Sequence, residues 1–131
     1  MKARDLSLLE IRGESIGNTS KDSSLEELFQ NRTLRPIIKL QNNLFIEVFI
    51  NYAIKQKNVF FKLSPEKKVV YIENVIQRDI KFRNSLKGMI IAFFTINEYS
   101  EYITNSSNLN KRMMNILIER LKSQVQLIDI E

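Results

Sequence analysis

Apolar residues recur at intervals of three and four along most of the chain, which is the spacing that one buried face of an α-helix requires. Val69, Ile72, Ile76 and Ile80 follow this spacing most clearly. Between residues 34 and 54, apolar side chains occupy most of the helical circumference, as is typical of a helix in the centre of a bundle. The pattern therefore predicts an all-α fold, a single compact bundle of five or six helices.

Capping signals indicate where several helices begin. Residues 64–66, Ser-Pro-Glu, combine an N-cap, a proline in the first turn and an acidic residue. Thr95 and Glu98 form a capping box for a short helix through residue 104. The apolar pattern slips in phase near Asp79, so we expect a kink or break in the helix there.

The central helix is expected to begin after Thr33 and to end near Gln56. Thr33 can cap this helix, and Pro36 falls inside its first turn, where a missing N–H is harmless. A short helix precedes it, because residues 23–27 offer a capping box and an acidic first turn. The two helices are therefore expected to be separate elements.

The chain begins with a segment of different composition. Between residues 13 and 24 the single apolar side chain is Ile16, and two of the three glycines are found here. Because so few apolar groups cannot offset the entropy of ordering, we expect residues 1–23 to form a mobile N-terminal arm and linker and residues 24–131 to form the helical domain. The arm carries a small apolar cluster that we expect to dock on the domain or on a second subunit, formed by Leu6, Leu8, Leu9 and Ile11.

The composition excludes several kinds of chemistry. The chain of 131 residues contains no cysteine and no histidine, which excludes disulfides, thiolate metal sites and the commonest general base. We therefore assign no catalytic residue, no metal ligand and no cofactor, and we favour a protein that is not an enzyme. No signal peptide is visible and the most apolar stretch is too short to span a membrane, so we expect a cytoplasmic protein.

Positive charge is concentrated in the middle of the chain. The net charge is +5, and residues 32–87 contain twelve Lys and Arg against four acidic residues. A basic region of this kind can attract nucleic acid or an acidic protein. The alternative is that these residues are ordinary surface charges, since no run of three occurs.

A polar stripe on the central helix is the first candidate site. Asn43, Glu47 and Asn51 recur at every fourth position of an otherwise apolar stretch. The stripe indicates a polar pocket, the solvent-exposed edge of the helix, or a buried ion pair made by Glu47. The last interpretation needs a cationic partner, because a lone buried carboxylate destabilises a fold or changes its pKa.

A basic group is the second candidate site, and it consists of Arg83, Asn84, Lys87, Asn110, Lys111 and Arg112. Arg83 and Lys87 are four residues apart and share one helical face. The other end of the group opens the last helix, where free N–H groups favour anions. If the two helices are neighbours, these residues line one site for an anion or an acidic peptide. The alternative is that they are ordinary caps and surface charges.

Three segments of the chain resemble a family of short uncharacterised bacterial proteins. These segments are residues 29–42 (FQNRTLRPIIKLQN), 81–91 (KFRNSLKGMII) and 105–114 (NSSNLNKRMM), and the pairs Phe94-Thr95 and Glu98-Tyr99 also belong to the likeness, which covers most of residues 29–121. Some members carry the automatic label "glyoxalase", which implies vicinal-oxygen-chelate chemistry, a βαβββ fold and a metal held by His and Glu. The chain contains no histidine and shows helical periodicity, so no catalytic residue is carried over from this label.

These features leave three classes of function. The first is an interaction or regulatory module that self-associates. The second is a module that binds nucleic acid or another anion through the basic middle of the chain. The third is an enzyme of the glyoxalase or lyase label.

A homodimer is expected from the apolar surface of the last helix. Met114 and Ile118 lie beside its main apolar stripe, so the helix presents more apolar surface than one contact needs. Phe94 and the arm residues 6–11 are expected to contribute to the same interface. A monomeric core that buries Met114 and Ile118 is the alternative.

Overall fold

The computed structural model describes residues 2–130, which form helices and loops without a β-strand. The elements are α1 (Ala3–Arg12), α2 (Leu25–Phe29), the π-helix η1 (Gln30–Leu34), α3 (Arg35–Leu40), α4 (Asn42–Lys55), the 3-10 helix η2 (Val59–Lys62), α5 (Pro65–Arg78), α6 (Ile80–Ile91), α7 (Ile96–Ile103), α8 (Ser106–Ser123) and the 3-10 helix η3 (Val125–Leu127). Because α2, η1 and α3 join without a break, the α-helices past residue 24 form six continuous stretches. The predicted all-α bundle of five or six helices is confirmed.

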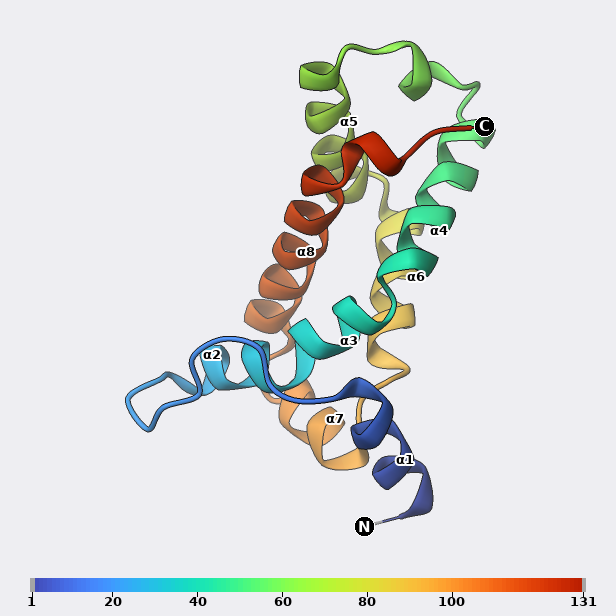
Figure 1. The fold of residues 1–131 in the computed structure, drawn as a ribbon. Coiled ribbons are helices and arrows are strands. Elements are labelled where there is room, and N and C mark those ends of the chain that lie inside the picture. The colour runs from blue at the N-terminus through green and yellow to red at the C-terminus, as the bar shows by residue number, and fades with distance from the viewer. Residues whose placement is uncertain (1, 131) are drawn as a thin grey trace.

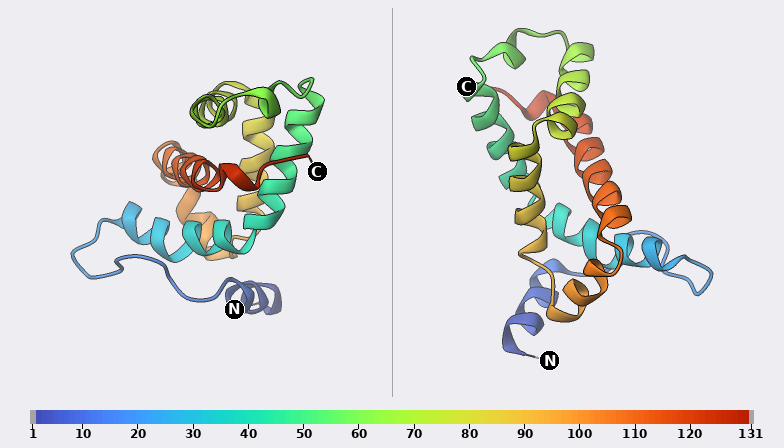
Figure 2. Two further views of the ribbon diagram at one scale, coloured as in Figure 1. Left: turned by 45° about the horizontal axis from the view of Figure 1, so that its top comes forward. Right: turned by 180° about the vertical axis from the view of Figure 1, so that it is seen from behind.

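The six stretches surround a shared apolar core (Figure 1). α8 packs against α5 and α6, and it also contacts η1, α3 and α7. α4 and α6 lie side by side, because Tyr52 of α4 stacks on Phe82 of α6 with ring centroids 3.9 Å apart. α1 and α7 lie together at the end of the bundle that α3 crosses (Figure 2). None of the helices formed by residues 2–130 is long and apolar enough to cross a membrane.

Met114 and Ile118 belong to the apolar core of the chain, and each is only 2% exposed. The expected dimer contact through these two residues is therefore wrong. α8 has neighbours on several sides, so its wide apolar face is covered within one chain. Phe94 is buried as well, against the rings of Phe29 and Tyr102. A dimer through another surface stays a prediction.

The predicted caps at Ser64 and Thr95 and the break at Asp79 are confirmed. Ser64 caps α5, and Thr95 forms a complete capping box with Glu98 at the start of α7. Asp79 separates α5 from α6 and caps α6 through the backbone N–H of Phe82. The Asp79 carboxylate also accepts a 2.7 Å hydrogen bond from the Tyr52 hydroxyl, which ties the break to α4.

The expected central helix from Thr33 to about Gln56 is wrong in two respects: the chain is already helical at Thr33, and the helix is interrupted at Gln41, which separates α3 from α4. Thr33 is buried in η1, and the helix runs through it from α2 into α3. The N–H of Arg35 donates to the carbonyl of Gln30, which is π-helical spacing, and Pro36 has no N–H to donate. The carbonyls of residues 31 and 32 therefore lose the donors that a regular α-helix would give them.

The N-terminal arm supplies the missing donors. The N–H of Ile16 donates to the carbonyl of Asn31 at 2.9 Å, and Arg12 Nη2 donates to the carbonyl of Arg32 at 3.2 Å. The irregular helix and the arm thus depend on one another, since a buried carbonyl without a donor is costly.

Polar residues rather than leucines fix α1 to the domain. Asp5 and Arg12 are buried, whereas Leu6 and Ile11 are each 56% exposed. Arg4 donates to the carbonyls of residues 92 and 94, and Arg12 donates to the carbonyl of residue 93. These hydrogen bonds hold α1 against the loop that follows α6. The expectation that the apolar cluster docks the arm on the domain is therefore corrected, because Asp5 and Arg12 make the contact instead. The mobility of residues 1–23 stays a prediction.

Candidate anion-binding groove

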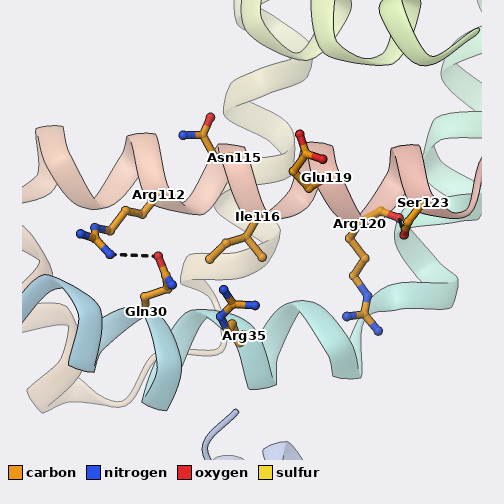
Figure 3. Close-up of a pocket in the computed structure, with 8 residues that line it drawn as sticks. All are labelled: Gln30, Arg35, Arg112, Asn115, Ile116, Glu119, Arg120 and Ser123. Atoms are coloured by element: carbon orange, nitrogen blue, oxygen red, sulfur yellow. Dashed lines mark hydrogen bonds between the residues drawn. The ribbon is translucent and has the colours of Figure 1, made fainter. Parts of the chain in front are cut away.

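A groove of about 610 Å³ lies between α8 and the continuous helix formed by α2, η1 and α3 (Figure 3). We call it the α3/α8 groove, and its lining residues are Gln30, Arg35, Arg112, Asn115, Ile116, Glu119, Arg120 and Ser123. Arginines come from both walls, because Arg35 lies on α3 while Arg112 and Arg120 lie on α8. The groove therefore concentrates positive charge between two elements that are distant in sequence.

Arg35 and Arg120 are oriented by amide side chains through their Nε atoms. Arg35 Nε donates to Asn31 Oδ1 at 2.9 Å, and Arg120 Nε donates to Asn42 Oδ1 at 2.8 Å. Neither arginine forms an ion pair with a carboxylate of residues 2–130. Both terminal nitrogens of each guanidinium thus stay available, in the fork that binds carboxylate or phosphate with two hydrogen bonds.

Arg112 is held at the other end of the groove. Its Nη1 donates to Gln30 Oε1 at 3.0 Å, and its Nε lies 3.6 Å from a carboxylate oxygen of Glu26. The Arg112 and Glu26 side chains are each about one-third exposed, so this ion pair contributes little to the stability of the fold. Arg112 is therefore able to contact a ligand.

The single acid among the lining residues is already paired. Glu119 lies 3.3 Å from Lys122 Nζ, which also lies 3.4 Å from Glu73. Burial by itself lowers the pKa of Lys122, but the two carboxylates outweigh it and hold that pKa above its usual value. Lys122 therefore stays charged and partly neutralises Glu119, so the groove keeps an excess of positive charge.

Asn31, which orients Arg35, is itself fixed by the linker. The Asn31 side chain donates to the carbonyl of Asn18 at 2.8 Å, and Asn31 is only 4% exposed. Gly17 has a φ of +102° and packs so closely that an added Cβ would lie 2.8 Å from Asn31 Cγ. Only glycine fits both the backbone conformation and the space, so the linker determines where the Arg35 guanidinium points.

The predicted basic group is divided between two places. Arg112 lies in the α3/α8 groove, while Arg83 and Lys111 line a separate pocket of about 380 Å³ between α6 and α8. Asn115 lines both and separates them on α8. α6 and α8 are neighbours, so Arg83 and Lys111 line the same pocket, without Arg112 and the rest of the basic group.

The other members of the basic group do not line either pocket. Asn110 accepts a 2.6 Å hydrogen bond from the Tyr102 hydroxyl, which makes it part of the α7–α8 contact. Asn84 is exposed on α6, and Lys87 is half-buried there. These three residues are therefore ordinary structural or surface residues. The expectation that residues 110–112 open the last helix is wrong, because α8 begins at Ser106 and their N–H groups are bonded within the helix.

The polar stripe of the central helix forms no pocket. Asn43, Glu47 and Asn51 are all exposed on α4, so the stripe is the solvent-facing edge of that helix. The interpretations that placed Glu47 in a polar pocket or in a buried ion pair are therefore corrected.

Arg112 is the one groove residue that the sequence identified, and the two other arginines of the groove, Arg35 and Arg120, were missed. Arg112, Ile116 and Arg120 are spaced by four residues, so the sequence already placed Arg120 on the same helical face as Arg112. This spacing is the signal that could have identified Arg120. Nothing in the sequence indicated that Arg35 lies opposite them, because that depends on how α3 crosses α8.

A second arginine site is fully occupied by the protein itself. Arg12 makes a two-pronged contact with Glu98, at 2.6 Å to Oε1 and 2.8 Å to Oε2. The Thr33 hydroxyl donates to Glu98 Oε2 at 2.7 Å and the backbone N–H of Thr95 donates to Oε1 at 2.8 Å. We call these four residues the Arg12 cluster. Every oxygen of its carboxylate has two donors, so no position is left for a ligand.

The hydrogen bonds of the Arg12 cluster lower the pKa of Glu98. Burial raises that pKa, but the hydrogen bonds from Arg12, Thr95 and Thr33 and the nearby guanidinium charge outweigh burial and hold it below its usual range. The carboxylate is therefore charged at neutral pH and paired with Arg12, whose side chain is 2% exposed.

Residues 2–130 contain no group of three or more acidic side chains placed to hold a metal ion. No model of a known protein family matches the chain, and neither a curated protein nor a solved structure is significantly similar to it. The likeness to the bacterial family and its glyoxalase label accordingly stay predictions.

Proposed function

We propose that the protein is a non-catalytic binding module that takes an anionic ligand into the α3/α8 groove. The observation that carries this proposal is the set of three guanidinium groups around one open groove, two of which have no carboxylate partner among the described residues. Arginine is the side chain best suited to bind carboxylates or phosphates with paired hydrogen bonds. Their fixed orientation lowers the entropy that a ligand must overcome on binding.

Retention on a heparin column tests the proposal, because heparin is a sulfated polyanion and binding through arginines depends steeply on salt. The double variant Arg35→Gln and Arg120→Gln is expected to elute at a clearly lower NaCl concentration than the parent protein. The matched control is the double variant Lys55→Gln and Lys67→Gln, which removes the same charge from exposed positions on α4 and α5. Equal loss of retention in both variants would show that net charge alone is responsible and would refute the proposal.

Self-association is a second candidate function, supported by an apolar stripe on α7. Ile96, Tyr99 and Ile103 are 57%, 48% and 56% exposed and lie at helical spacing on one face. Exposed apolar surface of this kind often marks a contact with another protein. Light scattering over a range of concentrations tests it: a homodimer through α7 predicts a mass above 15.4 kDa that Ile96→Ser and Ile103→Ser return to the monomer value. A constant monomer mass for the parent protein contradicts it.

A further inference from the structure

The wall that α8 contributes to the α3/α8 groove has a regular order of charged and apolar side chains. Arg112, Ile116 and Arg120 follow one another at every fourth residue of α8, and Figure 3 shows Ile116 between the two arginines. With a rise of about 1.5 Å per residue, the Cα atoms of successive members lie roughly 6 Å apart. The wall thus presents positive, apolar and positive groups over about 12 Å.

An extended peptide has nearly the same spacing. Its alternate side chains point to one side, about 6.6 Å apart, because each residue advances the chain by about 3.3 Å. A peptide with acidic residues at its first and fifth positions and an apolar residue at the third therefore meets Arg112, Ile116 and Arg120 in turn. The second and fourth side chains then face the opposite wall, where Arg35 lies.

The remaining lining residues suit a peptide backbone. Gln30, Asn115 and Ser123 offer amide and hydroxyl groups that can donate to carbonyls or accept from N–H groups. Glu119 on the rim accepts hydrogen bonds only, so it favours backbone N–H groups and disfavours additional negative charge.

A nucleic acid fits the same groove poorly. Strands carry a phosphate at every nucleotide, so a negative group would face Ile116 and Glu119 as well as the arginines. Binding of single strands also relies on aromatic side chains that stack on the bases, and the lining contains none. Charge complementarity and the apolar centre therefore favour a peptide.

We infer that the ligand of the α3/α8 groove is an extended acidic segment of a partner protein, with the order acid–any–apolar–any–acid. This inference rests on the proposed function, because it names the chemical class of the anion that the groove takes. Arg112 and Arg120 bind the two carboxylates, Ile116 contacts the apolar side chain, and Arg35 adds charge from α3.

Fluorescence anisotropy with labelled peptides at low ionic strength tests the inference. The probe is fluorescein-Gly-Glu-Ser-Leu-Ser-Glu, and the matched control is its isomer fluorescein-Gly-Glu-Glu-Leu-Ser-Ser, which has the same charge and composition. The ordered peptide is expected to bind about fivefold more tightly, since one hydrogen-bonded ion pair contributes roughly 1 kcal/mol. Replacing its leucine by serine is expected to weaken binding as well.

Variants of the protein locate the contact. Arg112→Gln and Arg120→Gln are each expected to remove the preference for the ordered peptide, whereas Lys67→Gln, an exposed charge on α5, is expected to keep it. Unfolding midpoints measured alongside show that the variants are folded.

Three outcomes overturn the inference while leaving the groove as an anion site. Equal affinity for the two isomers shows that order is not recognised, and tighter binding of a labelled eight-nucleotide single strand that depends on Arg112 and Arg120 identifies nucleic acid instead. Absence of peptide binding, together with heparin retention that still depends on Arg35 and Arg120, overturns it too. If heparin retention does not depend on those arginines, the proposed function itself fails.

Discussion

The Arg12 cluster and the α3/α8 groove are both built around arginines, and they differ in how completely those arginines are used. Arg12 is buried and its terminal nitrogens bind Glu98 and the carbonyls of residues 32 and 93. Arg35 and Arg120 each use only Nε, on an amide oxygen, and their remaining donors face an open groove. A guanidinium whose terminal nitrogens are bound to a carboxylate and carbonyls of the protein stabilises the fold, although the buried Arg12 Nε has no hydrogen-bond partner among the described residues. A guanidinium that is oriented through Nε and keeps its terminal nitrogens open is suited to a ligand.

The largest expected effect is at Glu98. Glu98→Ala leaves Arg12 buried without its partner, so we expect the free energy of unfolding to fall by about 3–5 kcal/mol. The double variant Arg12→Met and Glu98→Leu removes both charges and is expected to be less destabilised than Glu98→Ala. Urea unfolding midpoints measure the difference, and equal midpoints for the two proteins would show that the Arg12 cluster is not a coupled pair.

Acid is expected to weaken the Arg12 cluster and not the groove. Because the pKa of Glu98 is lower in the folded protein than in the unfolded chain, its contribution to stability is complete above the unfolded value, about 4.3, and is lost as the pH falls through the folded value. Hydrogen exchange of the α1 amides, compared with that of α8 at pH 7 and below pH 4, reports the loss. In Glu98→Gln the difference between α1 and α8 should no longer depend on pH.

Substitutions of the linker glycines test whether the arm shapes the groove. Gly17→Ala places a Cβ against Asn31 in an unfavourable backbone conformation, so we expect a loss of about 1–2 kcal/mol and weaker heparin retention through a displaced Arg35. Gly13→Ala is the control, since Gly13 also has a positive φ, of +77°, but no atom lies within 4 Å of its added Cβ. Unchanged retention in Gly17→Ala would separate the groove from the linker.

The smallest expected effect on stability is in the groove itself. Arg35→Gln and Arg120→Gln should each change the free energy of unfolding by no more than about 1 kcal/mol, because these side chains are only half-buried and each loses one hydrogen bond to a neutral amide. Thermal or urea unfolding checks this. A loss as large as that of Glu98→Ala would mean that these arginines hold the fold together rather than serve a ligand.

The local structure of this protein was largely predictable. Ser64, Asp79 and Thr95 each mark a helix start through a side-chain oxygen that accepts from a backbone N–H three residues later, and all three do so in the structure. Such contacts depend on residues within one turn, so their signal lies in the sequence. The start predicted at Thr33 failed because a similar local signal was overridden by a π-helix whose free carbonyls are satisfied by the distant arm.

The sequence by itself determined the all-α class, the helix starts at Ser64 and Thr95, the break at Asp79 and the exclusion of cysteine and histidine chemistry, because each follows from periodicity, capping or composition. Only the tertiary structure decided that Met114 and Ile118 are buried, that Arg12 meets Glu98 and that Arg35 faces Arg120. These outcomes join residues far apart in the chain, and the same arginine is compatible with a buried ion pair or an open groove. What distinguishes the two is which helices cross, and that is set by the packing of the whole core.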